Sequence, residues 1–288
     1  MIDPIVEPSY LELHRTGELQ KRGEALWRSM ESCELCPRMC GINKLKGEKG
    51  YCGADSQLMI SSFHQHYGEE EPLVGRGGSG TIFLTHCSLR CVFCSNWEIS
   101  QGGRGSKRTL EEMADMMLVL QDSGCPNINF VTPTHYSPHI VLAVDIAARK
   151  GLHIPLVYNT CGWEHVEIIK ELEGIMDIYL PDFKYADGEM ADRYSSGALT
   201  NPELTKKALL EMIRHLVMPN NVSGSKEVIS WIVGNLPKDT YVNIMSQYRP
   251  LYKARDYPKI ARRISSEEYT MVVEWARQGG LTNLNIQG

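Results

Sequence analysis

The stretch Gly80-Thr-Ile-Phe-Leu-Thr85 and the loop Cys87-Ser-Leu-Arg-Cys91-Val-Phe-Cys94 that follows it decide the fold of this chain. Residues 80–85 form a short apolar run, which is typical of a buried strand. Parallel α/β folds place their chemistry in the loops that follow the carboxyl ends of strands, and the three cysteines stand in such a loop. We therefore predict an α/β fold whose first strand delivers the cysteines to a functional site.

The spacing of the cysteines indicates what they bind. Thiolates separated by three and by two residues can converge on one face of a loop. Three thiolates satisfy three irons of a [4Fe–4S] cube and leave the fourth iron open. We predict that Cys87, Cys91 and Cys94 bind such a cluster. The alternatives are a zinc site with His86 as the fourth ligand, or a set of buried apolar cysteines.

Strand and helix patterns alternate after this loop. A helix is predicted from Thr109, where Glu112 completes a capping box, and another from Ser137 to Arg149. Apolar strands that alternate with helices imply a parallel sheet covered by helices. Six such units are too few for a closed eight-fold barrel, so we predict a partial (β/α)6 TIM-type barrel, with an open doubly wound sheet as the alternative. The further predicted strands are residues 129–132, 156–160, 175–180, 214–218 and 241–245, and the further helices are 166–172 and 225–236.

The chain is expected to have two parts. Residues 1–75 form an N-terminal extension with a helix from Tyr10, a cysteine-rich segment and then polar connecting chain. Residues 76–288 form the partial barrel and end in a helix. The predicted capping boxes at the two ends of the chain pair Ser9 with Glu12 and Ser265 with Glu268.

One junction departs from this pattern. Between residues 206 and 218 a helix pattern (KKALLEM) passes directly into a strand pattern (IRHLVMP) without Gly, Pro, Asn or Asp. Compact folds normally need a few turn residues there. We expect that a loop is missing between Lys206 and Arg214.

A second cysteine group lies in the N-terminal extension. Four thiolates suit either a fully ligated second [4Fe–4S] cluster or a structural zinc ion. The Gly- and Lys-rich segment before the last cysteine predicts a small loop wrapped around the metal. We favour the iron–sulfur centre, because the chain already needs cluster assembly. The ligands are Cys33, Cys36, Cys40 and Cys52.

Composition narrows the class of protein. The chain has 288 residues, 42% of them hydrophobic, which is enough to bury a sizeable core. Its net charge of −5 gives no field that would attract nucleic acid or an anionic membrane. No apolar run approaches the roughly 18–20 residues that span a bilayer, and residues 1–10 show no signal-peptide pattern. Clustering of the nine cysteines is typical of metal ligands in a reducing compartment, so we expect a cytoplasmic protein.

The cysteine motif of residues 87–94 and the chain after it resemble a known family. The CxxxCxxC spacing, with Phe93 before the last cysteine, is similar to the radical S-adenosylmethionine superfamily. The stretch CSLRCVFCSNWEIS (residues 87–100) resembles proteins related to the pyruvate formate-lyase activating enzyme, and the likeness covers about residues 30–285. It implies that the open iron chelates S-adenosylmethionine. An electron from the cluster then cleaves this cofactor to methionine and a 5′-deoxyadenosyl radical, which abstracts hydrogen.

The resemblance also implies roles for residues at later strand ends. Asn159, Thr160 and Asp182 would hold a monovalent cation beside the cofactor carboxylate, with Asn159 where the family has aspartate. Arg214 would pair with the methionyl carboxylate. Without the family, Asp182 and Lys184 are two charges at a strand end, which more often form a solvated pair. The residues expected to contact the cofactor are Phe93, Thr134, His135, Asn159, Thr160, Asp182, Lys184, Arg214 and Tyr248.

Two positions depart from the family. Thr132-Pro-Thr134-His135 replaces a Gly-Gly-Glu whose backbone receives the cofactor ammonium, and the glycine-permitted conformation is expected to be lost. The histidine after the sixth strand falls at Tyr248. The match therefore supports the cofactor site more than the substrate of the activating enzyme.

The remaining motifs and lone residues give less information about function. Residues 75–80 satisfy G-x-G-x-x-G but precede a strand, so we reject a nucleotide site there. Cys161 follows a strand end near the expected cofactor. The remaining lone residues, which we expect to be packed or solvated, are His64, His66, His139 and Cys125.

The function predicted from sequence is that of a radical S-adenosylmethionine enzyme. By resemblance, its target is a glycine of a partner glycyl-radical enzyme, and reduced flavodoxin or ferredoxin supplies the electron. One alternative is hydrogen abstraction from a small molecule or peptide. A different class is a non-catalytic iron–sulfur electron-transfer protein, which would bind iron without releasing 5′-deoxyadenosine.

Overall fold

The computed structural model describes residues 7–208 and 212–286. The chain forms two compact units, each built from three segments. The first unit comprises Met1–Ser88, Glu98–Asn159 and Glu167–Tyr179, and the second comprises Leu89–Trp97, Thr160–Val166 and Leu180–Gly288. None of the helices in the part that the structure describes is long and apolar enough to cross a membrane.

A six-stranded sheet organises the first unit, and its strand order is β3-β1-β2-β4-β5-β6. β2 pairs in parallel with β4, and β4 pairs in parallel with β5. β1 pairs antiparallel with β2 on one side and with the short β3 on the other. The last residues of β5 and β6 belong to the second unit. The strands are β1 (Met59–His66), β2 (Ser79–Leu84), β3 (Ser106–Lys107), β4 (Ile128–Val131), β5 (Leu156–Thr160) and β6 (Ile178–Pro181).

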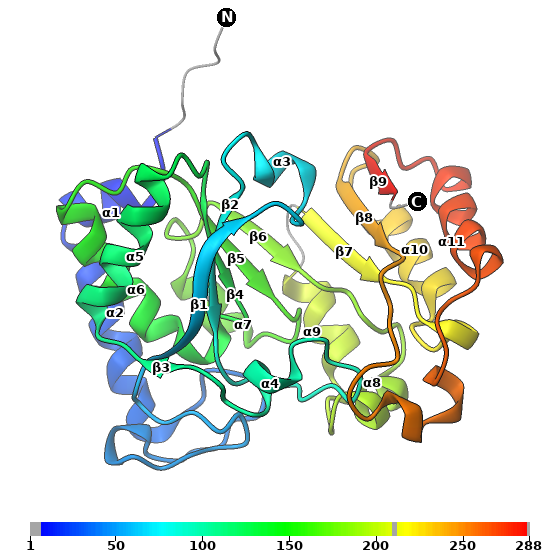
Figure 1. The fold of residues 1–288 in the computed structure, drawn as a ribbon, viewed down its shortest axis with the longest axis horizontal. Coiled ribbons are helices and arrows are strands. Elements are labelled where there is room, and N and C mark those ends of the chain that lie inside the picture. Colours follow the sequence, from blue (N-terminus) through cyan, green and yellow to red (C-terminus); the bar gives the residue numbers. More distant parts are fainter. Residues whose placement is uncertain (1–6, 209–211, 287–288) are drawn as a thin grey trace, which may run out of the picture. The chain divides into compact units, whose positions relative to one another are not determined.

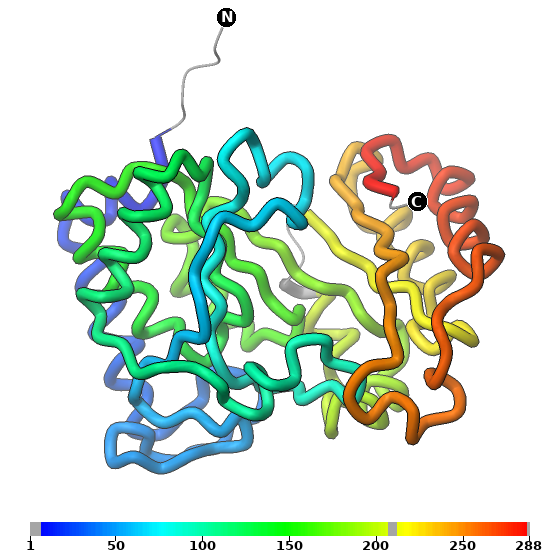
Figure 2. The backbone as a smooth tube through the Cα atoms, in the orientation of Figure 1, coloured from blue at the N-terminus to red at the C-terminus, as the bar shows by residue number. Residues whose placement is uncertain are grey.

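Four helices of the first unit pack together beside this sheet, as Figures 1 and 2 show in blue and green. α5 starts where the Thr109 hydroxyl accepts a bond from the Glu112 N–H and the Glu112 carboxylate accepts one from the Thr109 N–H. α6 starts at Ser137-Pro138, where proline needs no hydrogen-bond acceptor. These helices are α1 (Tyr10–Arg15), α2 (Glu18–Arg28), α5 (Leu110–Asp122) and α6 (Ser137–Arg149); the shorter elements are η1 (Ser29–Ser32), η2 (Lys44–Lys46), α3 (Glu71–Val74), α4 (Trp97–Ser100), η3 (Thr134–Tyr136) and α7 (Val166–Glu171).

The second unit has a three-stranded parallel sheet in the order β7-β8-β9. An isolated parallel bridge joins Asp182, just after β6, to Arg214 of β7. The core of this unit includes Phe183, Ile213 and Ile244, each 0% exposed. Its strands are β7 (Met212–Leu216), β8 (Tyr241–Met245) and β9 (Leu284–Ile286), and its helices are α8 (Gly188–Tyr194), α9 (Asn201–Ala208), η4 (Pro219–Asn221), α10 (Ser225–Asn235), η5 (Ala254–Asp256), η6 (Pro258–Ile260) and α11 (Ser266–Gln278).

The predicted α/β class is confirmed, and its parallel strands follow the chain as the partial (β/α)6 barrel requires. β5, β8 and α6 have the predicted bounds. The Ser265–Glu268 capping box of α11 is formed. The predicted division of the chain at residue 75 stays a prediction.

Two expectations about the N-terminal part are wrong. Ser9 makes no side-chain cap bond, because its own backbone is already helical and Glu12 instead pairs with Arg15 at 3.0 Å. The chain after Cys52 is not merely polar connection, because β1 lies within it. Most residues of β1 are polar, Phe63 is exposed, and of its apolar side chains only Ile60 is buried, so the apolar signal of a buried strand is weak there.

The unusual junction before β7 includes residues that the structure does not describe. α9 ends at Ala208 and β7 begins at Met212. The expected missing loop between Lys206 and Arg214 falls on residues 209–211, which lie outside the described residues.

Close packing explains the glycines of the stretch 75–80. A Cβ atom at Gly77 would lie 2.0 Å from the Gly124 oxygen, and one at Gly80 would lie 2.6 Å from the Asn127 oxygen. Both glycines are therefore required where the chain enters β2, which agrees with the rejection of a nucleotide site at this motif.

Candidate functional site

The loop that carries the three-cysteine motif begins directly after β2. Cys87 belongs to the first unit, where the His86 N–H donates to the Ile99 oxygen at 3.0 Å. His86 has a φ of 69° and Arg90 a φ of 55°, a left-handed backbone that non-glycine residues rarely adopt. Such strain is concentrated at functional sites, where the surrounding structure holds it. The loop is thus built to turn sharply on both sides of Cys87.

Cys91 lies in the interior of the second unit. Its sulfur is 3.0 Å from the Ser195 hydroxyl, which is 2.9 Å from the Tyr185 hydroxyl. Burial raises the pKa of the Cys91 thiol to about 12, and the nearby ammonium of Lys184 acts in the opposite direction. A thiolate here therefore needs a positive partner, which a bound metal centre supplies.

Cys94 is the least buried cysteine of the motif, and exposed chain follows it. Next to Cys94, the Phe93 ring packs on Tyr248 with 5.7 Å between the ring centroids. Tyr248 is held in turn by a 2.8 Å hydrogen bond from its hydroxyl to the Ile260 oxygen. Burial raises the pKa of Tyr248, so it stays a neutral phenol. Phe93 and Tyr248, both predicted site residues, are therefore in contact.

Three further predicted residues form a largely buried ionic group in the second unit. Asp182 pairs with Lys184, and the Arg214 Nε lies 2.8 Å from an Asp182 oxygen. Burial opposes ionisation of Asp182, but Arg214 and Lys184 hold its pKa below the usual range. Burial likewise opposes the charge of Lys184, and Asp182 raises its pKa nevertheless. Two cations thus face one anion, and the net positive charge suits an anionic ligand group.

Thr160 and the residues after it turn the chain at the end of β5. The Thr160 hydroxyl donates to the carboxylate of Glu164, which is 0% exposed. A Cβ atom at Gly162 would lie 2.2 Å from the Asp182 oxygen, so only glycine fits there. The neighbouring Cys161 is buried. The structure therefore brings the ends of β5 and β6 into close backbone contact.

Asn159, which stands where the resemblance expected an aspartate, lies beside a carboxylate. Its amide donates to Glu69 Oε2 at 2.9 Å, and the amide of Asn129 donates to the same oxygen at 2.8 Å. Glu69 comes from the chain after β1, far from Asn159 in sequence. A carboxylate from another segment of the first unit therefore lies beside Asn159.

The substitution of Gly-Gly-Glu by Thr132-Pro-Thr-His has a different outcome from the expected one. Thr132 keeps a left-handed backbone with a φ of 59°, and its N–H donates to the Asn159 oxygen at 2.9 Å. Thr134 and His135 begin η3, and His135 Nε2 donates to the Thr85 oxygen at 2.8 Å. Burial holds the pKa of His135 well below its usual range, so the ring is neutral. The conformation that threonine was expected to lose is retained.

The four N-terminal cysteines are gathered in one segment of the first unit. Cys33 is pinned by its N–H, which donates to the Ile42 oxygen at 2.9 Å, and by its oxygen, which accepts from the Gly41 N–H at 3.0 Å. Burial raises the pKa of Cys36 to about 12, and the charges of Cys52, Cys33 and Cys40 add to this. Cys33, Cys40 and Cys52 are therefore within electrostatic reach of Cys36, and their role as ligands of one metal centre stays a prediction.

All nine cysteines are thiols. Among residues 7–208 and 212–286, no three His, Cys, Asp or Glu side chains are arranged to hold a single metal ion. A single zinc ion needs its sulfurs roughly 4 Å apart, whereas the cysteine sulfurs of a four-iron cube lie farther from one another.

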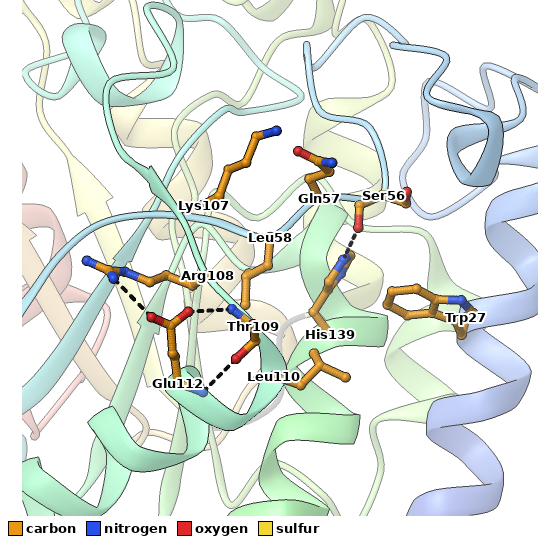
Figure 3. Close-up of a pocket in the computed structure, with 10 residues that line it drawn as sticks. All are labelled: Trp27, Ser56, Gln57, Leu58, Lys107, Arg108, Thr109, Leu110, Glu112 and His139. Atoms are coloured by element: carbon orange, nitrogen blue, oxygen red, sulfur yellow. Dashed lines mark hydrogen bonds and ion pairs between the residues drawn. The ribbon is translucent and has the colours of Figure 1, made fainter.

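A surface pocket of about 330 Å³ lies elsewhere in the first unit (Figure 3). His139 Nε2 donates there to the Ser56 oxygen at 2.8 Å, and the Trp27 ring meets the His139 ring edge-on at 4.9 Å. Arg108 at the rim is paired with Glu112. His139 is therefore a packed residue, in agreement with the sequence. His64 and His66 lie against Phe83 of the neighbouring strand.

Sequence reasoning missed several residues around these sites. Ser195 contacts the Cys91 sulfur, and Glu69 holds Asn159. Glu164 accepts from Thr160. Lys44 lies buried among the N-terminal cysteines. Each of them is separated from any motif or gives only the signal of an ordinary surface charge, so the sequence alone does not reveal them.

Comparison with known proteins adds two findings. The family model described as the radical SAM superfamily matches residues 81–222. The chain is 33% identical over 285 residues to the uncharacterized protein MJ0674 of Methanocaldococcus jannaschii, covering 94% of this chain and 82% of the relative. It is 24% identical over 267 residues to the uncharacterized protein MJ0808 of the same organism, covering 82% and 78% of the two chains.

Proposed function

Because this chain belongs to the radical S-adenosylmethionine superfamily, whose members bind a [4Fe–4S] cluster and S-adenosylmethionine, we propose that it activates a partner enzyme by abstracting hydrogen from a glycine. The observation that carries the catalytic part is the three-cysteine loop directly after β2, inside the region that matches the family. When bound, the cluster and cofactor supply reductive cleavage of the sulfonium and a 5′-deoxyadenosyl radical.

The donor set fits the cluster. Cys87, Cys91 and Cys94 offer three soft sulfur ligands, and two of them are buried. Their proposed role is to bind three irons. Lys184 lies close enough to Cys91 to favour its thiolate, because its positive charge lowers the pKa of that thiol. Ser195 would hold the Cys91 sulfur in place through their 3.0 Å contact.

The cofactor carboxylate is proposed to bind at the group formed by Asp182, Lys184 and Arg214. Its excess positive charge is buried, with side-chain exposures of 12% for Lys184 and 14% for Arg214. A carboxylate gains more from such a charge than from one in water. Asp182 would keep the two cations in position. Within the first unit, Asn159 and Glu69 lie together and offer the oxygen ligands that a monovalent cation would need.

We propose that the electron comes from an acidic carrier such as reduced flavodoxin or ferredoxin. The stretch 249–263 has six basic residues and one acidic residue, although the whole chain is acidic. It adjoins the cysteine loop within the second unit, because the Lys253 N–H donates to the Val92 oxygen at 2.9 Å and Tyr252 stacks on Trp97 at 5.1 Å. A basic surface beside the cluster loop favours encounter with an acidic partner.

The catalytic proposal is tested by anaerobic reconstitution of the full chain with iron and sulfide. Dithionite and S-adenosylmethionine should then yield 5′-deoxyadenosine, and Cys91→Ala should abolish this yield. Cys125→Ala is the matched control, because Cys125 is also a buried cysteine but lies outside both groups. An iron-loaded protein that releases no 5′-deoxyadenosine would instead be an electron carrier.

The proposal of an acidic electron donor has its own test. Lys253→Glu with Arg255→Glu should slow cluster reduction by reduced flavodoxin or ferredoxin at least tenfold, and leave reduction by dithionite unchanged. Lys238→Glu with Arg277→Glu reverses two exposed charges elsewhere in the second unit and should have little effect. Equal rates in the two variants would contradict the assignment of this surface.

We also propose a second metal centre at the N-terminal cysteines, either a [4Fe–4S] cluster or zinc. The support is the grouping of four thiols in one segment, three of them buried. Protein purified without oxygen should contain about eight irons per chain, or about four irons and one zinc. About four irons and no zinc would exclude both versions.

A further inference from the structure

Lys44 is a lysine whose side chain is buried in the cysteine-rich segment. It is 1% exposed, and its Nζ lies 3.8 Å from the Cys52 sulfur. The neighbouring acids are engaged elsewhere, since Asp55 pairs with Lys49 and Glu48 accepts from the Asn43 N–H. Within residues 7–208 and 212–286, no carboxylate forms an ion pair with Lys44. A buried ammonium in this position calls for an anion that the protein chain by itself does not place there.

The groups that face Lys44 show where that anion belongs. His135 and His139 also lie close enough to Lys44 to sense its charge, and burial lowers the pKa of both, so they add no charge. Asp55 acts on His139 from farther along the segment. The ammonium thus faces the Cys52 sulfur at 3.8 Å, and metal-bound thiolates would supply the negative charge that it lacks.

A glycine, Gly50, packs closely against the Cys40 thiol, where a larger residue would crowd the sulfur. A Cβ atom at Gly50 would lie 3.0 Å from the Cys40 sulfur. Met39 and Gly41, on both sides of Cys40, have left-handed φ angles of 43° and 64°. The chain thus accepts backbone strain at Met39 to direct Cys40, as expected for a ligand-holding turn.

Packed contacts lead from this segment to the catalytic loop inside the first unit. Tyr136 is close enough to Cys52 for its charge to raise the Tyr136 pKa, although burial raises it more. The Tyr136 and His135 rings are 4.5 Å apart, and His135 donates to the Thr85 oxygen, two residues before Cys87. This arrangement suits a centre that exchanges electrons, which zinc does not.

We propose that the N-terminal cysteines bind a one-electron [4Fe–4S] cluster and that Lys44 is its internal counter-charge, stabilising the reduced form. This deepens the proposed second centre and rests on it. One electron from the low-potential carrier enters the cluster, whose charge with four thiolates changes from 2− to 3−; no bond is broken and Lys44 keeps its proton. Lys44 acts as a positioning and tuning residue rather than a ligand.

The test is an EPR-monitored redox titration of the anaerobically reconstituted full chain. Lys44→Met should lower the midpoint potential of the N-terminal cluster by at least the equivalent of a tenfold change in the reduction equilibrium, about 59 mV for one electron. Lys44→Arg should retain the potential. Lys46→Met is the matched control, because Lys46 belongs to the same η2 turn and is exposed.

The same samples distinguish this proposal from the catalytic one. The signal of the Cys87–Cys94 cluster, with its response to S-adenosylmethionine, should be the same in every variant, and its absence would refute the catalytic proposal alone. Selective loss of the N-terminal irons in Lys44→Met, with iron retained in Lys44→Arg, equally supports a counter-charge. An unchanged potential in Lys44→Met, zinc in place of iron, or iron loss in both Lys44 variants overturns it.

Discussion

At the scale of single residues, the ionic group of Asp182, Lys184 and Arg214 has a net positive charge, and we expect it to bind the carboxylate of the cofactor. Arg214→Ala should weaken S-adenosylmethionine binding about ten- to a hundredfold, because a charge-assisted contact to a carboxylate is lost. Equilibrium binding to the reconstituted protein measures this. Arg277→Ala, at an exposed position of α11, should leave affinity unchanged. If Arg214→Ala binds as tightly as the unmodified chain, the arginine serves only Asp182.

A second residue-scale prediction concerns acid stability. Burial lowers the pKa of His215 to about 4, and its ring donates to the Phe183 oxygen and accepts from Ser225. The unfolded chain takes up a proton below about pH 6.5, and the folded chain does so only near pH 4. The stabilisation is therefore complete above pH 6.5 and is lost as the pH falls toward 4, up to about 3 kcal/mol.

Chemical denaturation at pH 7 and pH 4.5 measures the effect of this histidine. The free energy of unfolding should fall less between these two values in His215→Gln than in the unmodified chain. His153→Gln is the control, because His153 is exposed. An equal fall in the chain with and without His215 would show that other groups govern its acid unfolding.

At the scale of secondary-structure elements, two helix starts with similar sequences differ. Thr109 caps α5 with its side chain, whereas Ser9 makes no such bond before α1. Thr109→Ala should lower the free energy of unfolding by about 1 kcal/mol. Ser9→Ala should change it by much less, and thermal or urea unfolding compares the two. Equal losses would mean that capping geometry does not govern these helix ends.

Helices and strands differ in how well the sequence predicts them. Periodic apolar residues and local caps predict α5, α6 and α11 well, because the signal lies within one segment. β1 has few buried side chains and is stabilised by pairing with β2, a partner distant in sequence, so periodicity alone misses it. The cysteine loops are predicted for a similar reason as the helices, since ligand spacing is local. Glu69 comes from elsewhere in the chain, and only folding brings it to Asn159. Lys44 lies within the cysteine-rich segment, but a lysine there gives only the signal of a surface charge, so its burial beside Cys52 is not visible in the sequence.

At the scale of the whole molecule, we expect the cysteine-rich segment to depend on its proposed metal centre more than the rest of the chain does. It contains only the short η2 turn and encloses thiols with Lys44, so its order is expected to come largely from metal binding. Removal of iron by a chelator should open residues 33–57 to proteases, while the chain from residue 110 onward stays protected. Limited proteolysis with mass spectrometry of the loaded and stripped protein tests this. Equal protection in both would show that the segment folds without metal.

The antiparallel strand β1 has a consequence for shortening this protein. β1 covers the edge of β2 from Ile60 to His66, with one shift of register between Ile60 and Ser62. A chain begun at residue 76 would keep the catalytic cysteines but leave that edge bare, with its backbone amides and carbonyls facing solvent. Bare edges recruit other strands, so such a fragment would be prone to aggregation and inclusion-body formation. A minimal radical-generating version of this enzyme must therefore retain the chain from Met59 onward.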